Sequence, residues 1–148
     1  MSRPLFVYGT LRDPDVLRAV LGHPLDDIAL RAASAPGIRV VYFPARTYPA
    51  LLAAPAAVAE GILLEHLCAT DLALLDLFEG AEYVRRPLDV IVSGAIESAD
   101  VYWPAVAIPP EAPDWRFDEW VGRHKSAFLA AETSGIEDLR RHLSSLPR

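Results

Sequence analysis

Two stretches of this 148-residue sequence organise its fold and its chemistry, and the first is Phe6-Val7-Tyr8-Gly9-Thr10-Leu11-Arg12. Its apolar run predicts a strand that breaks at Gly9. A helical pattern follows, with Asp13 as the N-cap, Pro14 in the first helical position and Gly22 as the stop. Such a turn points successive main-chain N–H groups into one space, where they can bind an anion, although most strand–glycine–helix turns are only turns.

The second stretch is Leu75-Asp76-Leu77-Phe78-Glu79-Gly80-Ala81-Glu82-Tyr83-Val84-Arg85-Arg86. It ends an amphipathic helix that we expect to be capped by Thr70 or Asp71 and stopped by the glycine of this stretch. A solvated helix end is the simplest alternative, but Phe78 faces inward and Glu79 follows it directly. We therefore expect the Glu79 carboxyl group to be partly buried, with a pKa raised toward that of a general base. Glu82, beyond the helix stop, is expected to face water.

The rest of the sequence predicts a small sheet and two further helices. We expect strands at 38–43, 51–52, 58–67, 84–92 and 99–106, and helices at 115–131 and from Ser134 onward. Prolines confine the first two strands to short or edge positions, and the last two form a hairpin. Gly61 marks a bulge or a close backbone approach. Because no repeat, linker or boundary is visible, the length predicts one domain over residues 1–148.

The composition is that of a globular protein, with 52% hydrophobic and 23% charged residues. A net charge of −6 repels a phosphate backbone, so nucleic acid is not an expected partner. The single cysteine, Cys68, cannot form an internal disulfide, and no signal peptide precedes the first apolar segment, so we expect a cytoplasmic protein. The alanine-rich run 50–59 is far shorter than the roughly 20 apolar residues that span a membrane, so no membrane partner is expected.

Common catalytic and cofactor signatures are missing from the sequence. The four histidines show no metal-ligand spacing, so we expect neither a metal nor another cofactor. His124 shares an apolar stripe with Trp120 and Phe128 and is expected to be a packed histidine, while Cys68 is expected to be a small buried side chain. The sequence contains no GxSxG, GxGxxG or GxxxxGK[ST] motif, which removes the main support for a nucleophilic hydrolase or a nucleotide-binding protein.

Taken together, the two stretches resemble the gamma-glutamylcyclotransferase-like superfamily, which includes gamma-glutamylamine cyclotransferases and plant avirulence-induced proteins. The resemblance rests on an FVYGTLR strand and turn at residues 6–12 and an LDxFEGxEYxR pattern at residues 75–85. It covers nearly the whole chain, because other parts also look like family segments: Tyr48-Pro49-Ala50-Leu51, Val58-Ala59-Glu60-Gly61, and the tryptophans Trp115 and Trp120.

This resemblance implies an α+β fold, a small mixed β-barrel flanked by helices, with a pocket at one end. In the family, the YGTL turn binds the substrate and the glutamate of the FEG motif is the catalytic acid/base, which here is Glu79. The family also has a pocket tyrosine after that motif, and a basic residue often follows its turn. The substrate-binding positions that the resemblance implies are Tyr8, Gly9, Thr10, Leu11, Arg12 and Tyr83. The implied reaction is the metal-independent release of 5-oxoproline from a γ-glutamyl compound.

These residue types suit that reaction. A γ-glutamyl substrate contains its own nucleophile, the α-amine, and the intramolecular geometry already provides a large effective molarity. The enzyme needs a carboxylate that moves a proton and N–H groups that hold the developing oxyanion. Glu79 and the turn at Tyr8–Leu11 supply both.

Two other interpretations of the same residues stay open. A small-molecule-binding protein on the same fold would keep the barrel without needing Glu79, which this chain retains. A family member that removes a γ-glutamyl protecting group from a biosynthetic intermediate would use the same residues as a turnover enzyme. The sequence leaves the leaving amine and the oligomeric state undefined.

Overall fold

The computed structural model describes residues 3–131 and residue 141. Strands and short helices are interspersed along them, which confirms the expected α+β fold. The elements are β1 (Leu5–Val7), the 3-10 helix η1 (Thr10–Arg12), α1 (Pro14–Leu21), β2 (Ala29–Tyr42), β3 (Pro49–Glu65), α2 (Ala69–Glu79), the 3-10 helix η2 (Gly80–Glu82), β4 (Tyr83–Val92), β5 (Ala95–Pro104) and α3 (Phe117–Arg123). The helix expected from Ser134 onward lies outside the described residues.

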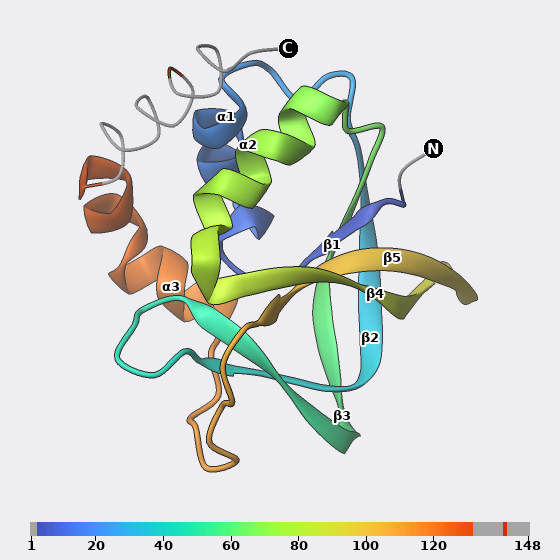
Figure 1. The fold of residues 1–148 in the computed structure, drawn as a ribbon, viewed down its shortest axis with the longest axis vertical. Helices are drawn as coiled ribbons and strands as arrows, with labels where there is room; N and C mark the ends of the chain where they lie inside the picture. Colours follow the sequence, from blue (N-terminus) through green and yellow to red (C-terminus); the bar gives the residue numbers. More distant parts are fainter. Residues whose placement is uncertain (1–2, 132–140, 142–148) are drawn as a thin grey trace.

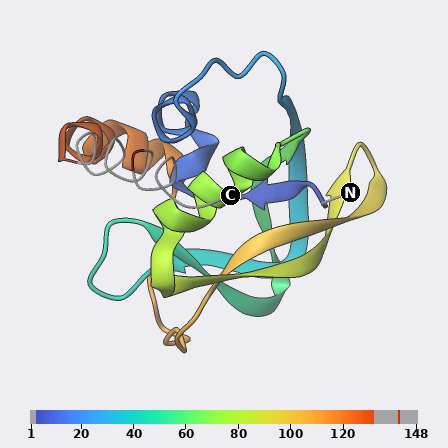
Figure 2. The ribbon, with the colours of Figure 1, turned by 45° about the horizontal axis from the view of Figure 1, so that its top comes forward.

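The strands form a closed barrel in the order β1-β3-β2-β4-β5. β1 is antiparallel to β3 and parallel to β5, and the other neighbouring strands are antiparallel. The closure between β2 and β4 rests on the pairing of Ser34 with Ile91. Figures 1 and 2 show α1, α2 and α3 grouped together along one side of the barrel. The mixed barrel flanked by helices that the family resemblance implied is therefore confirmed.

The β2–β3 hairpin is longer than the prolines of this region suggested. β2 has 14 residues and β3 has 17, so the prediction of short or edge strands was wrong. Pro49 opens β3 opposite Tyr42, and Pro36 borders a register shift at which residues 54–57 have no partner on β2. A proline has no N–H to donate to a ladder, but at a strand start or a register shift no regular ladder bond is lost.

Gly61 in β3 is a point of close backbone approach, as predicted. A Cβ atom at this position would lie 2.4 Å from the main-chain oxygen of Val7 and 2.7 Å from the ring of Phe6. Any larger residue would therefore push β1 away from β3. The absence of a side chain lets β1 enter the barrel, and β1 leads directly into the turn at Gly9.

The helices beside this turn begin and end at capping residues. Asp13 caps α1 by accepting hydrogen bonds from main-chain N–H groups of the first turn, and Gly22 ends the helix with a φ of 77°. The cap of α2 is Cys68, whose sulfur accepts from the N–H of Asp71, so the prediction of Thr70 or Asp71 as the cap was wrong. Cys68 is exposed rather than buried, because the capping position lies outside the core.

The β4–β5 hairpin is confirmed, with a tighter turn than the sequence suggested. Val92 pairs with Ala95, so only Ser93 and Gly94 form the turn. Both have a positive φ, 50° and 80°, which is the backbone conformation that two-residue hairpins favour.

The helix predicted from Trp115 begins later and is interrupted. The N–H of Trp115 still donates to a carbonyl of β2, at 3.0 Å, so the chain there is extended and α3 starts at Phe117. The helix ends before His124, whose φ is −121°, and residues 125–131 are again helical. The ring centroids of Trp120 and Phe128 lie 5.5 Å apart, whereas His124 is only half-buried beside them.

The buried side chains form two main clusters, and β1 contributes to both. Leu5 and Val7 belong to the cluster under the helices, which also contains Leu75 and Trp120. Phe6 points the other way, into the cluster inside the barrel. This alternation follows from the two-residue period of a strand. The turn that follows β1 therefore starts at the boundary between barrel and helices.

Candidate functional site

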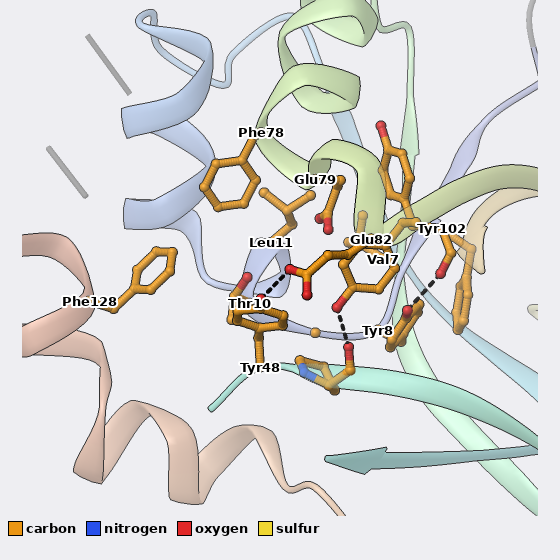
Figure 3. A pocket seen from close by; sticks show the side chains of 14 residues that line it. Val7, Tyr8, Thr10, Leu11, Tyr48, Phe78, Glu79, Glu82, Tyr102 and Phe128 are labelled. Atoms are coloured by element: carbon orange, nitrogen blue, oxygen red, sulfur yellow. Dashed lines mark hydrogen bonds between the residues drawn. The ribbon is translucent and has the colours of Figure 1, made fainter. Parts of the chain in front are cut away.

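A pocket of about 220 Å³ opens where the end of β1 meets the end of α2. Its walls come from β1, the loop between β2 and β3, the last turn of α2, η2, β4, β5 and the helical segment that contains Phe128 (Figure 3). Six of the seven residues that the sequence analysis assigned to the site line this pocket, namely Tyr8, Gly9, Thr10, Leu11, Glu79 and Tyr83. Pairing of the strands therefore brings two stretches together that lie far apart in the sequence.

The turn Tyr8–Leu11 forms one wall of the pocket and is held at both ends. Before it, β1 is paired with β3 and β5, and after it the chain enters the capped helix α1. Gly9 passes so close to Pro49 that a Cβ atom would lie 2.6 Å from the proline Cγ. In the described part of the chain, the main-chain N–H groups of Gly9, Thr10 and Leu11 make no hydrogen bond. These donors are therefore available to a ligand.

Glu79 is brought to the pocket by the last turn of α2. Gly80 ends the helix with a φ of 70°, and the chain then turns through η2 into β4. The Glu79 side chain is half-buried and points into the pocket (Figure 3). Burial raises the pKa of Glu79 from 4.5 to about 8, and the nearby carboxylates of Asp76 and Glu82 add to the rise. The upward direction of this pKa shift agrees with the expectation from the sequence.

Two tyrosine hydroxyl groups of the pocket are hydrogen-bonded to main-chain carbonyls. Tyr8 donates to the carbonyl of Tyr102 at 2.6 Å, and Tyr83 donates to that of Pro49 at 2.5 Å. Burial raises the pKa of both Tyr8 and Tyr83, so both phenols stay neutral at ordinary pH. Each hydroxyl oxygen retains acceptor capacity toward a ligand.

Glu82 lines the pocket too, so the prediction that it faces water was wrong. The hydroxyl of Tyr48 donates to one carboxylate oxygen of Glu82, and Nε of Arg46 lies 3.4 Å from the other. The reason is η2, a tight turn after Gly80 that carries the chain back toward the pocket instead of into solvent. Because the Glu82 carboxylate already has two partners, Glu79 is the freer of the two acids.

Arg12 is the one predicted site residue that does not line this pocket. Its guanidinium stacks on the ring of Phe117, 4.5 Å from the centroid, and lines a separate, more open cavity. Burial lowers the pKa of Arg12, and the carboxylates of Glu60 and Asp118 oppose that effect. In a 3-10 turn consecutive side chains point about 120° apart, so Leu11 and Arg12 necessarily face different sides.

Other reactive side chains lie elsewhere. His23 contacts Asp71 at 2.7 Å beside the exposed Cys68, and the hydrogen bond to Asp71 raises the pKa of His23.

Among the residues that the structure describes, no three or more His, Cys, Asp or Glu side chains are grouped so that they could hold a metal ion. No helix within the described ranges is long and apolar enough to cross a membrane.

The sequence analysis did not identify Tyr48, Tyr102 or Phe128 as pocket residues. For Tyr48 a signal existed, since it begins the Tyr48-Pro49-Ala50-Leu51 segment that resembles the family. Tyr102 and Phe128 reach the pocket only through strand pairing and helix packing, and no local pattern marks them.

Solved structures share this fold, a small closed barrel flanked by helices. The solution structure of a protein from Arabidopsis thaliana superimposes with a TM-score of 0.66 at 24% identity, covering 99% of this chain and 95% of that one. A structure described as a gamma-glutamyl cyclotransferase gives a TM-score of 0.60 at 15% identity, covering 71% of this chain and 68% of the other. At these identities the likeness concerns the fold alone.

Similarity in sequence identifies the family. Residues 5–121 match the family model described as "Gamma-glutamyl cyclotransferase, AIG2-like". AIG2-like protein C of Arabidopsis thaliana is 29% identical over 139 residues, covering 92% of this chain and 79% of the relative. This chain belongs to the gamma-glutamyl cyclotransferase, AIG2-like family.

Proposed function

We propose that this protein is an enzyme of the γ-glutamylcyclotransferase type, which converts a γ-glutamyl amine, amino acid or peptide into 5-oxoproline and a free amine. The observation that carries the proposal is the position of Glu79. Its half-buried carboxyl group, with a pKa of about 8, shares a pocket with the available N–H groups of Gly9, Thr10 and Leu11. A proton acceptor and a set of oxyanion donors are the two functions that the cyclisation requires.

The reaction follows from the substrate and these groups. The Glu79 carboxylate takes a proton from the α-ammonium group of the substrate, and the free amine attacks the γ-carbonyl carbon to close a five-membered ring. The N–H groups of the turn stabilise the oxyanion of the tetrahedral intermediate or hold the α-carboxylate. Glu79 then returns its proton to the amide nitrogen, and the ring nitrogen releases its second proton to solvent. The bond from the γ-carbon to the amide nitrogen breaks, and the amine leaves.

The raised pKa of Glu79 fits a group that both accepts and returns a proton. General acid–base catalysis is most efficient when the pKa of the catalytic group lies near the working pH, and it contributes about 10²- to 10⁴-fold. A carboxylate with its ordinary pKa would be too weak a base to take a proton efficiently from an ammonium group. Burial at the end of α2 therefore supports Glu79 as the acid/base.

The experiment that tests the proposal is a panel of γ-glutamyl compounds, including γ-glutamyl-alanine, glutathione and γ-glutamyl-lysine, analysed for 5-oxoproline by mass spectrometry. We expect the wild-type protein to release 5-oxoproline from at least one of them. The same panel identifies the preferred leaving amine. Binding of 5-oxoproline without any turnover across the panel would favour a binding protein on this fold.

The other expectations from the sequence belong to the same proposal. They are a single domain over residues 1–148, activity without a cofactor, and a cytoplasmic location.

A further inference from the structure

Two residues of the Leu75–Arg86 stretch have no part in the proposed mechanism, yet they form an ion pair directly behind Glu79. Asp76 lies one helical turn before Glu79 on α2, and Arg85 lies on β4. Arg85 donates from Nε to Oδ1 of Asp76 at 3.1 Å and from Nη2 to Oδ2 at 3.2 Å. This two-point contact fixes the direction of the carboxylate as well as its position.

A third partner reaches the same carboxylate from the pocket wall. The hydroxyl of Tyr102, on β5, donates to Oδ1 of Asp76 at 2.7 Å. Tyr102 is only 5% exposed and lines the pocket, and its main-chain carbonyl accepts the hydroxyl of Tyr8 at 2.6 Å. Asp76 thus joins the last turn of α2 to β4 and β5, and Tyr102 continues the connection to the turn that contains Tyr8.

The arginine of this group is held on its far side as well. Nη1 of Arg85 donates to Oδ2 of Asp100 at 3.2 Å. Asp100 is 8% exposed, and its other oxygen lies 3.4 Å from the guanidinium of Arg3. Because both sides of the Arg85 guanidinium are engaged, it is a fixed support for Asp76 and not a freely moving surface charge.

We propose that Asp76, clamped by Arg85 and Tyr102, is a positioning residue that holds the Glu79 carboxyl group against the turn Tyr8–Leu11. The inference rests on the proposed function, because that function gives Glu79 the reacting role. Position matters at such a site, since a displacement of about 1 Å in a reacting group can cost on the order of 10²-fold in rate. A free helix end after Gly80 would allow displacements of that size.

Asp76 also acts on Glu79 through its charge. Its carboxylate contributes to the raised pKa of Glu79, second to burial. The other titratable groups that interact with Glu79 are Glu82, Tyr8, Tyr83 and Tyr102. The phenols stay neutral because burial raises their pKa, so Asp76 and Glu82 are the charges that oppose ionisation of Glu79.

Two substitutions test the positioning role of Asp76 and the effect of its charge separately. Tyr102→Phe removes the hydroxyl but keeps the ring and the carbonyl that binds Tyr8. Asp76→Asn keeps an acceptor for Tyr102 and removes the negative charge. Asp89→Asn is the matched control, because Asp89 is an exposed carboxylate on β4 without a hydrogen bond in the described part of the chain.

The measurements are kcat and KM against pH on the best γ-glutamyl substrate, and the titration of Glu79 by carbon NMR of its carboxyl group. For Tyr102→Phe we expect kcat to fall about tenfold with an unchanged KM and an unchanged Glu79 titration. For Asp76→Asn we expect a comparable loss of kcat, a Glu79 pKa below 8, and an acid limb of the rate profile that moves to lower pH. Asp89→Asn should match the wild type.

Wild-type kcat in Tyr102→Phe would overturn the positioning role, and an unmoved Glu79 titration in Asp76→Asn would overturn the role of the charge. If Asp76→Asn does not fold, Arg85→Gln takes its place and should raise the pKa of Glu79, because the Asp76 charge is then unbalanced. An unchanged or lowered pKa in that variant would contradict the inference. Absence of turnover in the wild type would count against the proposed function instead. The NMR titration still tests the effect of the Asp76 charge on Glu79 in that case, because it needs no substrate.

Discussion

Burial of the Glu79 carboxyl group has opposite effects on the proposed catalysis and on the stability of the folded protein. It raises the pKa of Glu79 to about 8, which suits proton exchange with an amine. It also makes the ionised form unfavourable in the folded protein, although the proposed reaction begins from that form. The same side chain should therefore limit activity at low pH and stability at high pH.

Glu79→Gln keeps the size of the side chain and removes the proton acceptor. We expect kcat for 5-oxoproline formation to fall by at least about 10²-fold. Glu82→Gln should lower kcat only a few-fold, because the Glu82 carboxylate is already engaged by Tyr48 and Arg46. Steady-state kinetics on the best substrate of the panel compare the two, with circular dichroism as the control for folding. If Glu82→Gln is inactive and Glu79→Gln is active, the assignment of the acid/base to Glu79 is wrong.

The rate should depend on pH through ionisation of Glu79. The general base acts in its ionised form, and a pKa raised to about 8 means that this form dominates only above pH 8. We therefore expect kcat/KM to fall about tenfold for each pH unit below 8. A profile that is flat from pH 5 to pH 8 would show that no such group controls the reaction.

The stability of the protein should depend on ionisation of Glu79 in the opposite direction from the activity, falling as the pH rises. Below pH 4.5 Glu79 is protonated in both states, but between pH 4.5 and 8 the unfolded chain loses the proton while the folded protein keeps it. Stability is therefore lost as the pH rises through this window. The melting temperature of Glu79→Gln, relative to that of the wild type, should be higher at pH 9 than at pH 5. Equal differences at the two pH values would mean that the pKa of Glu79 is not raised by folding.

The turn between β1 and α1 is shaped by its neighbour in the β2–β3 loop as much as by its own residues. Gly9 lies against the ring of Pro49, and the carbonyl of Pro49 accepts the hydroxyl of Tyr83. Three parts of the pocket wall therefore meet at this contact. Since a proline ring cannot rotate aside as a flexible side chain does, any Cβ at Gly9 must displace the turn itself.

Gly9→Val should consequently abolish binding of 5-oxoproline while most of the fold is retained. The new Cβ would lie 2.6 Å from Cγ of Pro49, so the turn and its N–H groups are displaced from their positions in the pocket wall. Isothermal titration calorimetry measures the affinity. Gly122→Ala is the control, because a Cβ at Gly122 meets nothing within 4 Å and alanine favours the helix by about 0.5–1 kcal/mol. Wild-type affinity in Gly9→Val would remove the turn from the binding site.

The molecule as a whole depends on how closely β1 approaches β3, since β1 also pairs with β5 and so bridges the barrel. That approach is possible because Gly61 has no side chain. The buried strand also connects the cluster inside the barrel with the cluster under the helices. A defect at this single position should thus spread to both clusters and to the pocket.

Gly61→Ala should destabilise the protein by at least about 2 kcal/mol, because the new methyl group overlaps a backbone atom that cannot move without its strand. The closest atom is the main-chain oxygen of Val7, which would lie 2.4 Å from the new Cβ. Urea unfolding gives the free energy, again with Gly122→Ala as the control. A loss below about 0.5 kcal/mol, the range of ordinary surface substitutions, would show that β1 adjusts freely.

The amino-acid sequence by itself determined part of the local structure of this protein, although not the cap of α2 or the start of α3. The cap at Asp13 and the stops at Gly22 and Gly80 were predictable because capping depends on residues within one helical turn. The two motif stretches also sufficed for the family and for the barrel. Both conclusions rest on residue types at fixed local spacing, which the printed sequence displays directly.

Only the tertiary structure decided which distant side chains share the pocket. Tyr102 reaches Asp76 because β5 pairs with β4 in one register, η2 turns Glu82 back toward Tyr48, and the 3-10 turn sends Arg12 to another cavity. The physical reason is that strand register and the direction of a tight turn depend on packing between segments far apart in the chain. Local propensities carry no information about that packing.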